Sequence, residues 1–141
     1  LALAAGVCDG MGFGDNTKAA LMTRGIVEMA RLGSALGGQP ETFSGLSGIG
    51  DLIVTCTSRH SRNRHVGEEL GRGGRLEDII QAMGGQVAEG VTTADSAYQL
   101  ARRAAVDTPI IDQVHAGLYE GRDPRQAVRD LMTREAKPER V

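Results

Sequence analysis

Aromatic side chains and excess positive charge are both scarce in this chain of 141 residues. It holds two Phe, two Tyr and no Trp, and its 18 acidic residues outnumber its 16 basic ones, which gives a formal net charge of -2. Proteins that bind nucleic acids usually present a basic face or stack bases on aromatic rings. We therefore expect no nucleic-acid partner.

Long apolar runs are missing as well. No stretch is long enough to span a bilayer, and no signal peptide is recognisable. The two cysteines, Cys8 and Cys56, lie far apart without the spacing of metal ligands, which favours reduced thiols in a cytoplasmic protein. The chain begins at Leu1, inside an apolar run and without Met, so we expect it to be a fragment of a longer protein.

The periodicity that is present is helical. No segment alternates as a half-buried strand does. Residues 16–36 form the longest helical pattern, with a polar stripe at Arg24, Glu28 and Arg31 on an otherwise mostly buried helix. Glycine is abundant, with 20 residues. Because a glycine inside a helix costs about 1 kcal/mol against alanine, Gly25 and Gly33 indicate close helix packing.

Glycine, proline and capping residues mark the ends of shorter helices. Pro40 opens a short turn, which three glycines are expected to break. Later helices are expected to start at a capping residue, in two cases followed by proline in the first turn. The pattern predicts an all-α domain of seven or eight helices over residues 1–133, with residues 134–141 as a frayed tail. The breaking glycines are Gly45, Gly48 and Gly50, and the expected caps are Ser61, Thr92 with Asp95, Thr108 before Pro109, and Asp123 before Pro124.

The most informative stretch is residues 48–64, GIGDLIVTCTSRHSRNR. It holds one acid, Asp51, in apolar company, where burial and a neighbouring cation can tune a pKa for proton chemistry. Ten residues on, Ser61, Arg62 and Asn63 open a helix. Free N–H groups, the positive end of the helix dipole and an arginine fork together favour a phosphate. The stretch predicts an enzyme that acts on a small phosphorylated substrate.

Each of these residues also has a structural interpretation. Asp51 after glycine fits an N-cap, and Ser61 fits a cap followed by solvated side chains. His60 and His65 lack carboxylate or cysteine companions, so we expect no metal site. His115 is interpreted as structural. The glycines of residues 10–14 lack a preceding strand and the spacing of a nucleotide loop, which favours a turn between two helices.

Three segments carry a resemblance to a known family: LALAAGVCDGMGFGDNTKAALMTRGIVEMARLG, FSGLSGIGDLIVTCTSRHSRNR and VAEGVTTA. Over residues 1–132 the chain resembles the C-terminal half of bacterial NAD(P)-dependent sn-glycerol-3-phosphate dehydrogenases. The resemblance implies a helical substrate domain like the C-terminal domain of 6-phosphogluconate dehydrogenase. It also implies a separate Rossmann domain that binds most of the NAD(P)H. The implied reaction interconverts dihydroxyacetone phosphate and sn-glycerol 3-phosphate for phospholipid synthesis.

The resemblance also implies roles for individual residues. Asp51 would lie at the reacting centre and Thr55 near the substrate. Three residues would hold the substrate phosphate. One of these three would also contact the cofactor, as would two residues of a later segment. The phosphate residues are Ser61, Arg62 and Asn63, and the cofactor residues are Arg62, Val87 and Glu89.

One departure from the family pattern matters. The family's acid/base lysine, in a Lys-Asn pair, falls just before Leu1, and Lys18 matches a different position. We therefore expect this chain alone to fold without catalysing the reaction, and to associate, as a homodimer. Two alternatives stay open: a helical dimerisation module without a site of its own, and a related dehydrogenase domain acting on another small acid, such as 6-phosphogluconate or ketopantoate.

Overall fold

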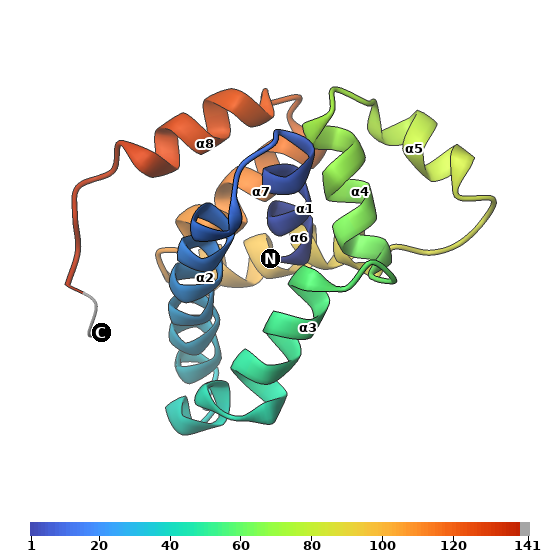
Figure 1. The fold of residues 1–141 in the computed structure, drawn as a ribbon. Coiled ribbons are helices and arrows are strands. Elements are labelled where there is room, and N and C mark those ends of the chain that lie inside the picture. Colours follow the sequence, from blue (N-terminus) through green and yellow to red (C-terminus); the bar gives the residue numbers. More distant parts are fainter. Residues whose placement is uncertain (139–141) are drawn as a thin grey trace.

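The computed structural model describes residues 1–138, and within them every regular element is helical (Figure 1). The predicted all-α fold is therefore confirmed. The elements in chain order are α1 (Ala2–Gly10), α2 (Asp15–Ala35), a 3₁₀ turn η1 (Pro40–Ser44), a π-helical turn η2 (Leu46–Gly50), α3 (Asp51–Thr57), α4 (Arg62–Gly71), α5 (Leu76–Ala82), α6 (Glu89–Arg103), α7 (Pro109–Tyr119) and α8 (Pro124–Met132).

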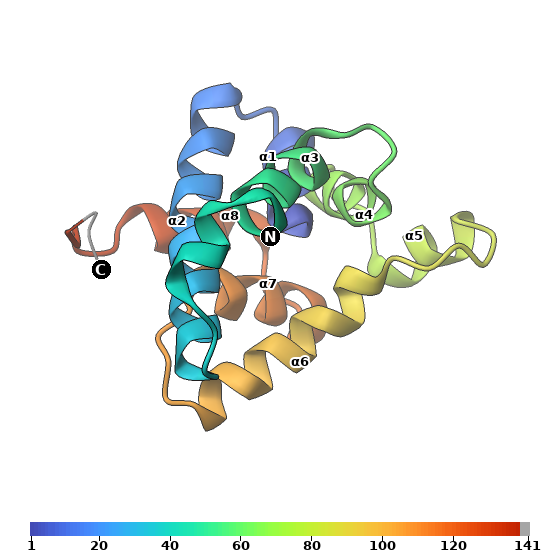
Figure 2. The ribbon, with the colours of Figure 1, turned by 90° about the horizontal axis from the view of Figure 1, so that it is seen from below.

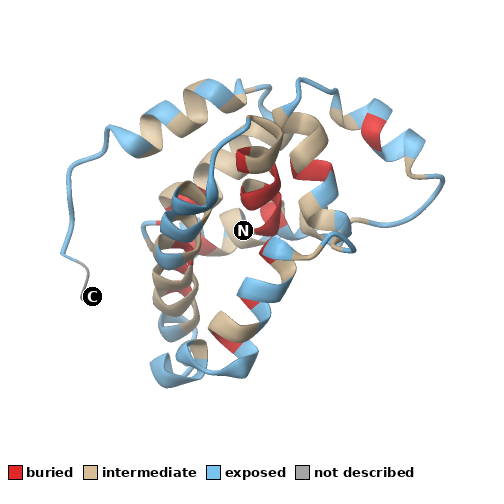
Figure 3. Ribbon diagram, viewed as in Figure 1, coloured by how far each residue is buried: buried red, intermediate tan, exposed pale blue. Residues whose placement is uncertain are grey.

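Helix α1 lies at the centre of the molecule, in contact with α2, α3, α4, α6 and α7, while α5 and α8 lie at the periphery (Figures 1 and 2). Buried residues gather on α1 and on the sides of its neighbours that face it (Figure 3). One side of α1 packs Ala2 and Ala5 against α3, and the other packs Leu3 against Val66 of α4 and Ile79 of α5. A single apolar helix thus organises two core clusters.

Helices α1 and α4 touch backbone to backbone because both carry two glycines four residues apart. A Cβ atom at Gly6 would collide with the carbonyl oxygen of Arg64, and one at Gly67 with that of Leu3. Gly10 and Gly71 repeat this close approach one turn further along. Small residues at this spacing let two helices approach closely. Only glycine, which has no Cβ atom, fits at these four positions.

The packing predicted at the two glycines of α2 is confirmed. A Cβ atom at Gly25 would meet the side chain of Leu1 at 2.7 Å, and one at Gly33 would collide with the ring of Phe43. Both glycines therefore accept a side chain from another element. The turn between α1 and α2 at residues 10–14 is also as predicted, with Gly12 at φ +78°.

The predicted helix starts after Ser61, Thr108 and Asp123 are confirmed, whereas the expectations for Gly48 and Thr92 are wrong. Ser61 accepts a hydrogen bond from the Arg64 N–H, and Asp123 accepts one from the Arg125 N–H. Gly48, however, lies inside the turn η2, which leads without a gap into α3. Thr92 is not a cap, because α6 begins earlier, at Glu89. Sequence cues did not predict that Gly48 lies inside a π-helical turn. Glycine is needed there because a Cβ atom at Gly48 would collide with the carbonyl group of Phe43.

Glu28 is a further correction. Predicted as part of the polar stripe of a mostly buried helix, it is itself only 3% exposed. Its carboxylate accepts the N–H groups of Ile110 at 2.8 Å and Ile111 at 3.2 Å, at the start of α7. Thr108 makes no side-chain cap there. Burial raises the pKa of Glu28 to about 7, partly offset by the two backbone donors. The cap of α7 thus comes from α2.

His115 is packed within the α6–α7 pair. It is 7% exposed, stacks on the ring of Tyr98 with centroids 3.9 Å apart, and lies 3.0 Å from a carboxylate oxygen of Asp95. Beyond α8, Arg134 and Lys137 pair with Asp107. The predicted frayed tail falls partly outside the described residues, at 139–141, and the domain boundary at residue 133 stays a prediction.

Candidate functional site

The predicted site residues gather around two adjoining cavities. The larger, of about 500 Å³, is lined by Asp51, Thr55, Asn63 and Glu89 among others. The smaller, of about 320 Å³, is lined by six of the seven predicted residues. Thr55, Asn63 and Glu89 line both cavities, so the two spaces meet at these side chains. The six are Thr55, Ser61, Arg62, Asn63, Val87 and Glu89.

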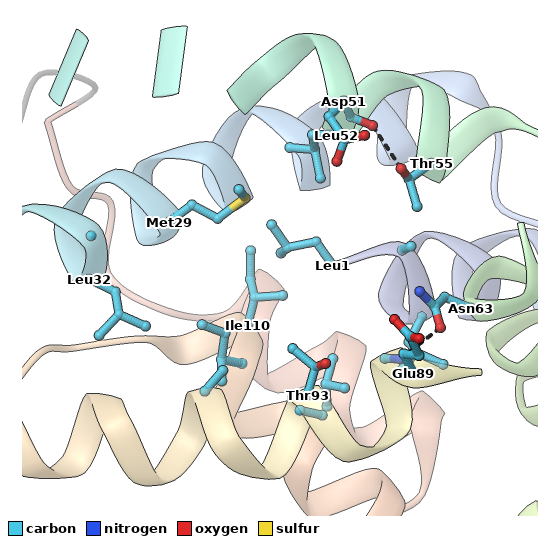
Figure 4. Close-up of a pocket in the computed structure, with 18 of the residues that line it drawn as sticks. Leu1, Met29, Leu32, Asp51, Leu52, Thr55, Asn63, Glu89, Thr93 and Ile110 are labelled. Atoms are coloured by element: carbon cyan, nitrogen blue, oxygen red, sulfur yellow. Dashed lines mark hydrogen bonds between the residues drawn. The ribbon is translucent and has the colours of Figure 1, made fainter. Parts of the chain in front are cut away.

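Asp51 is the first residue of α3 and faces the larger cavity (Figure 4). It is exposed, so the buried environment expected from its apolar neighbours in sequence is not found. The N-cap of α3 is Gly50, and Asp51 makes no capping hydrogen bond with its side chain. Its backbone carbonyl accepts the Thr55 hydroxyl at 2.8 Å. The capping interpretation of Asp51 is therefore wrong, and its carboxylate is open to a ligand.

The first turn of α4 forms one wall of the smaller cavity. Ser61 caps the helix through Oγ, which accepts the Arg64 N–H at 3.1 Å. The N–H groups of Arg62 and Asn63, at the first two helical positions, have no partner within the helix. The Arg62 side chain is exposed and lines the cavity, with no ion pair to any residue of the described part of the chain. This turn offers N–H donors and a free guanidinium to an anion.

Arg64, two residues further along, serves the core instead. Its Nη2 lies 2.8 Å from a carboxylate oxygen of Asp9, and its Nη1 lies 3.3 Å from Glu68. Asp9 also pairs with Lys18 at 2.7 Å. Neither Arg64 nor Lys18 lines either cavity. The two neighbouring arginines of the motif thus have different roles, one in packing and one at the site.

The start of α6 forms the opposite wall. Val87 and Glu89 line the smaller cavity, and the carboxamide oxygen of Asn63 accepts the Gly90 N–H at 2.8 Å. The N-cap of α6, Ala88, has no side chain that could fill this role. Two helix N-termini, those of α4 and α6, therefore converge on one cavity, and both contribute the positive end of a helix dipole.

The two cavities combine positive groups with carboxylates. Arg62 and the helix starts provide positive groups at the smaller cavity, Glu89 provides a carboxylate where the two cavities meet, and Asp51 provides a second carboxylate at the larger cavity. Thr93 of α6 also lines the larger cavity, one turn after Glu89, and Leu1 lines it at the start of α1 (Figure 4). The i,i+4 spacing of Glu89 and Thr93 was a signal that sequence reasoning missed. Among residues 1–138, no three His, Cys, Asp or Glu side chains gather as for a metal ion.

These features describe a helical domain in which two adjoining cavities bring together an exposed arginine, two helix N-termini and two carboxylates. The family model described as "NAD-dependent glycerol-3-phosphate dehydrogenase C-terminus" matches residues 1–129. This chain belongs to that family, as the sequence resemblance predicted.

Similar proteins agree with that assignment. Glycerol-3-phosphate dehydrogenase [NAD(P)+] of Chlorobium limicola is 57% identical over 139 residues, covering 99% of this chain and 41% of the relative. That of Geobacter sulfurreducens is 56% identical over 140 residues, covering 99% and 42%. A crystal structure of glycerol-3-phosphate dehydrogenase from Coxiella burnetii superposes with a TM-score of 0.91 at 47% identity, covering 94% of this chain and 41% of that one. The chain spans about two fifths of the length of these relatives.

Proposed function

We propose that this chain is the substrate domain of a cytoplasmic enzyme that interconverts dihydroxyacetone phosphate and sn-glycerol 3-phosphate with NAD(P)H, for glycerophospholipid synthesis. One observation carries the proposal. Seven residues from three separate parts of the sequence line two cavities that meet at Thr55, Asn63 and Glu89. The family resemblance in the sequence implies the same seven residues.

The smaller cavity suits the substrate phosphate. Arg62 is positioned to bind two phosphate oxygens through its fork, while the first N–H groups of α4 bind others. Ser61 uses its oxygen as an acceptor in the helix cap, and its hydroxyl hydrogen remains able to donate. Binding energy from this phosphate, remote from the reacting carbon, serves to align the carbonyl.

The larger cavity suits the reacting carbonyl. Reduction of a ketone puts negative charge on its oxygen, which a cationic acid stabilises and protonates. The family resemblance places a lysine for this role just before Leu1, and Leu1 shares the larger cavity with Asp51. This proximity supports a role for Asp51 in holding the charge and orientation of that lysine. The lysine assignment remains a prediction.

The residues also suit a nicotinamide cofactor held mainly by another domain. When bound, NAD(P)H supplies the hydride for the reduction. Arg62 offers a cation for its anionic groups, and Val87 is 60% exposed beside the smaller cavity, an apolar surface suited to a flat ring. Val54, also 63% exposed, lines the same cavity. Exposed apolar side chains around a site are typical of a surface that a ligand or another domain covers.

We further infer that the protein forms a homodimer, and light scattering of the full-length protein tests this: a strict monomer at high concentration contradicts it. No helix within residues 1–138 has the length and hydropathy needed to cross a membrane.

The proposed reaction is tested by steady-state assays of the full-length protein. Dihydroxyacetone phosphate, ketopantoate and 6-phosphogluconate are each offered with NADH or NADPH, or with the oxidised cofactor where the substrate requires it. We expect kcat/KM to be largest for dihydroxyacetone phosphate. A preference for either other substrate contradicts the assignment.

A further inference from the structure

Asn63 and Gly90 hold the starts of α4 and α6 together. The Gly90 N–H donates to Oδ1 of Asn63 at 2.8 Å, although 27 residues separate them in sequence. Gly90 is the second residue of α6, where a helix leaves its N–H without an internal partner. The N-cap residue Ala88 has no polar side chain. Asn63 of α4 therefore does for α6 what a capping side chain normally does.

This hydrogen bond determines which way the Asn63 carboxamide faces. A backbone N–H only donates, so the oxygen of Asn63 must face Gly90 and the NH₂ group must face away. Figure 4 shows the nitrogen of Asn63 on the side away from the dashed hydrogen bond that its oxygen accepts. Within residues 1–138, this nitrogen has no hydrogen-bond partner. Asn63 lines both cavities, so it presents a donor where they meet.

The observed position of the Asn63 side chain leaves room only for glycine at position 90. A Cβ atom there would lie 2.7 Å from Oδ1 of Asn63 and 2.8 Å from its Cγ. These atoms belong to the end of a side chain rather than to backbone, so the fold can absorb a larger residue by moving Asn63. Gly90 has no positive φ that would by itself demand glycine. Glycine at position 90 is thus explained by Asn63.

We propose that Gly90 is a positioning residue for substrate recognition, acting through Asn63. By accepting the Gly90 N–H and occupying the space of the missing Cβ, the Asn63 side chain is fixed with its NH₂ group toward an anionic oxygen of the substrate. The proposal rests on the proposed function, because a phosphorylated substrate is what the donor serves. Gly90 also lines the larger cavity but has no side chain to offer the substrate.

The kinetic test uses the full-length enzyme with dihydroxyacetone phosphate as the varied substrate. Gly90→Ala should raise KM about tenfold with kcat changed less, as expected when one hydrogen bond to a charged group is misplaced. Asn63→Asp keeps an acceptor for Gly90 but replaces the donor by a negative charge, and should raise KM about a hundredfold. Gly117→Ala is the matched control, because a Cβ at this glycine of α7 meets only ordinary contact, at 3.9 Å.

A double-mutant cycle separates action through Asn63 from a direct effect. In an Asn63→Ala background, adding Gly90→Ala should change KM by less than about twofold, because the side chain that it displaces is already gone. Full additivity of the two substitutions overturns the proposal. So does a wild-type KM for Gly90→Ala in the otherwise wild-type enzyme.

Amide hydrogen exchange gives a readout independent of catalysis. The Gly90 N–H should be protected in the wild type and in Asn63→Asp, and should exchange faster in Asn63→Ala. If the wild-type enzyme turns over no dihydroxyacetone phosphate, the proposed function fails. The hydrogen-exchange measurement still tests the orientation of Asn63 in that case, because it does not depend on turnover. Equal protection of Gly90 in all three proteins overturns the orientation.

Discussion

The side of α4 that faces α1 and the side that faces the smaller cavity use the same residue type, arginine, in different ways. Arg64, on the packed side, is held by Asp9 and Glu68, whereas Arg62, two positions earlier, is exposed with no ion pair among the described residues. Gly67 and Gly71 bring the backbones of α1 and α4 together. The close packing of α4 against α1 fixes where the N-terminus of α4 lies in the fold.

The comparison predicts that substituting Arg62 lowers activity, whereas substituting Arg64 lowers stability. Arg62→Ala should lower kcat/KM for dihydroxyacetone phosphate by roughly 2–4 kcal/mol, through loss of a phosphate contact, with little change in Tm. Arg62→Lys should fall between, because it keeps the charge and loses the fork. Arg64→Ala should instead lower Tm. Steady-state kinetics and thermal unfolding of the full-length enzyme measure both.

Arg59→Ala is the matched control, because Arg59 is an exposed arginine that lines neither cavity. We expect it to leave kcat/KM and Tm near wild type. An Arg62→Ala variant that retains wild-type KM and kcat/KM contradicts the phosphate assignment, and reduces the first turn of α4 to a helix cap.

The packed side of α4 is broken most directly at Gly67. Gly67→Ala drives a Cβ into the Leu3 carbonyl, a backbone atom that cannot rotate away, and should lower the free energy of unfolding by about 3 kcal/mol. Urea denaturation measures the change. Gly117→Ala should be neutral or stabilising, by up to about 1 kcal/mol, since it gains helix propensity without a clash. Equal stability of the two variants contradicts the close contact.

The contact between α2 and α7 differs from the glycine contact because it depends on a buried carboxyl group. Burial raises the pKa of Glu28 from 4.5 to about 7. A raised folded-state pKa means that the stabilisation is fully present below about pH 4.5 and is lost as the pH rises through 7. Relative to Glu28→Gln, which stays neutral, the wild type should lose about 2 kcal/mol between pH 5 and 8. Parallel pH profiles of the two proteins in urea denaturation contradict this cause.

A substitution of Asp51 separates an effect on the chemical step from the effect on substrate binding expected at Arg62. Asp51→Asn keeps the shape of the side chain and removes the charge proposed to hold the catalytic lysine. We expect kcat to fall about tenfold, with KM for dihydroxyacetone phosphate nearly unchanged, in contrast to Arg62→Ala. Steady-state kinetics of the full-length enzyme distinguish the two. A rise in KM without loss of kcat would instead place Asp51 in substrate binding alone.

Sequence patterns predicted the elements that local signals determine. Ser61, Asp123 and the glycines of α2 act as expected because caps and missing side chains leave a signature within a few residues. The fold class followed from helical periodicity. The seven candidate site residues came mainly from the family resemblance, and the structure brings all of them to the two cavities.

What sequence patterns could not predict depends on partners distant along the chain. Glu28 forms part of a polar stripe in the sequence, and its burial depends on two N–H donors of α7, 82 and 83 residues away. Asp51 looked buried among apolar neighbours, yet its helix turns that carboxylate toward a cavity. The role of Gly90 required Asn63 on another helix. Each of these outcomes depends on tertiary packing, which overrides local preference.

The most direct test of the central claim is a crystal structure of the full-length enzyme with dihydroxyacetone phosphate. We predict the phosphate at the first turn of α4, with Arg62 guanidinium nitrogens and the Asn63 Nδ2 within about 3.2 Å of its oxygens. Arg64 should remain on Asp9. A phosphate bound elsewhere, with Arg62 still exposed to solvent, would contradict the account.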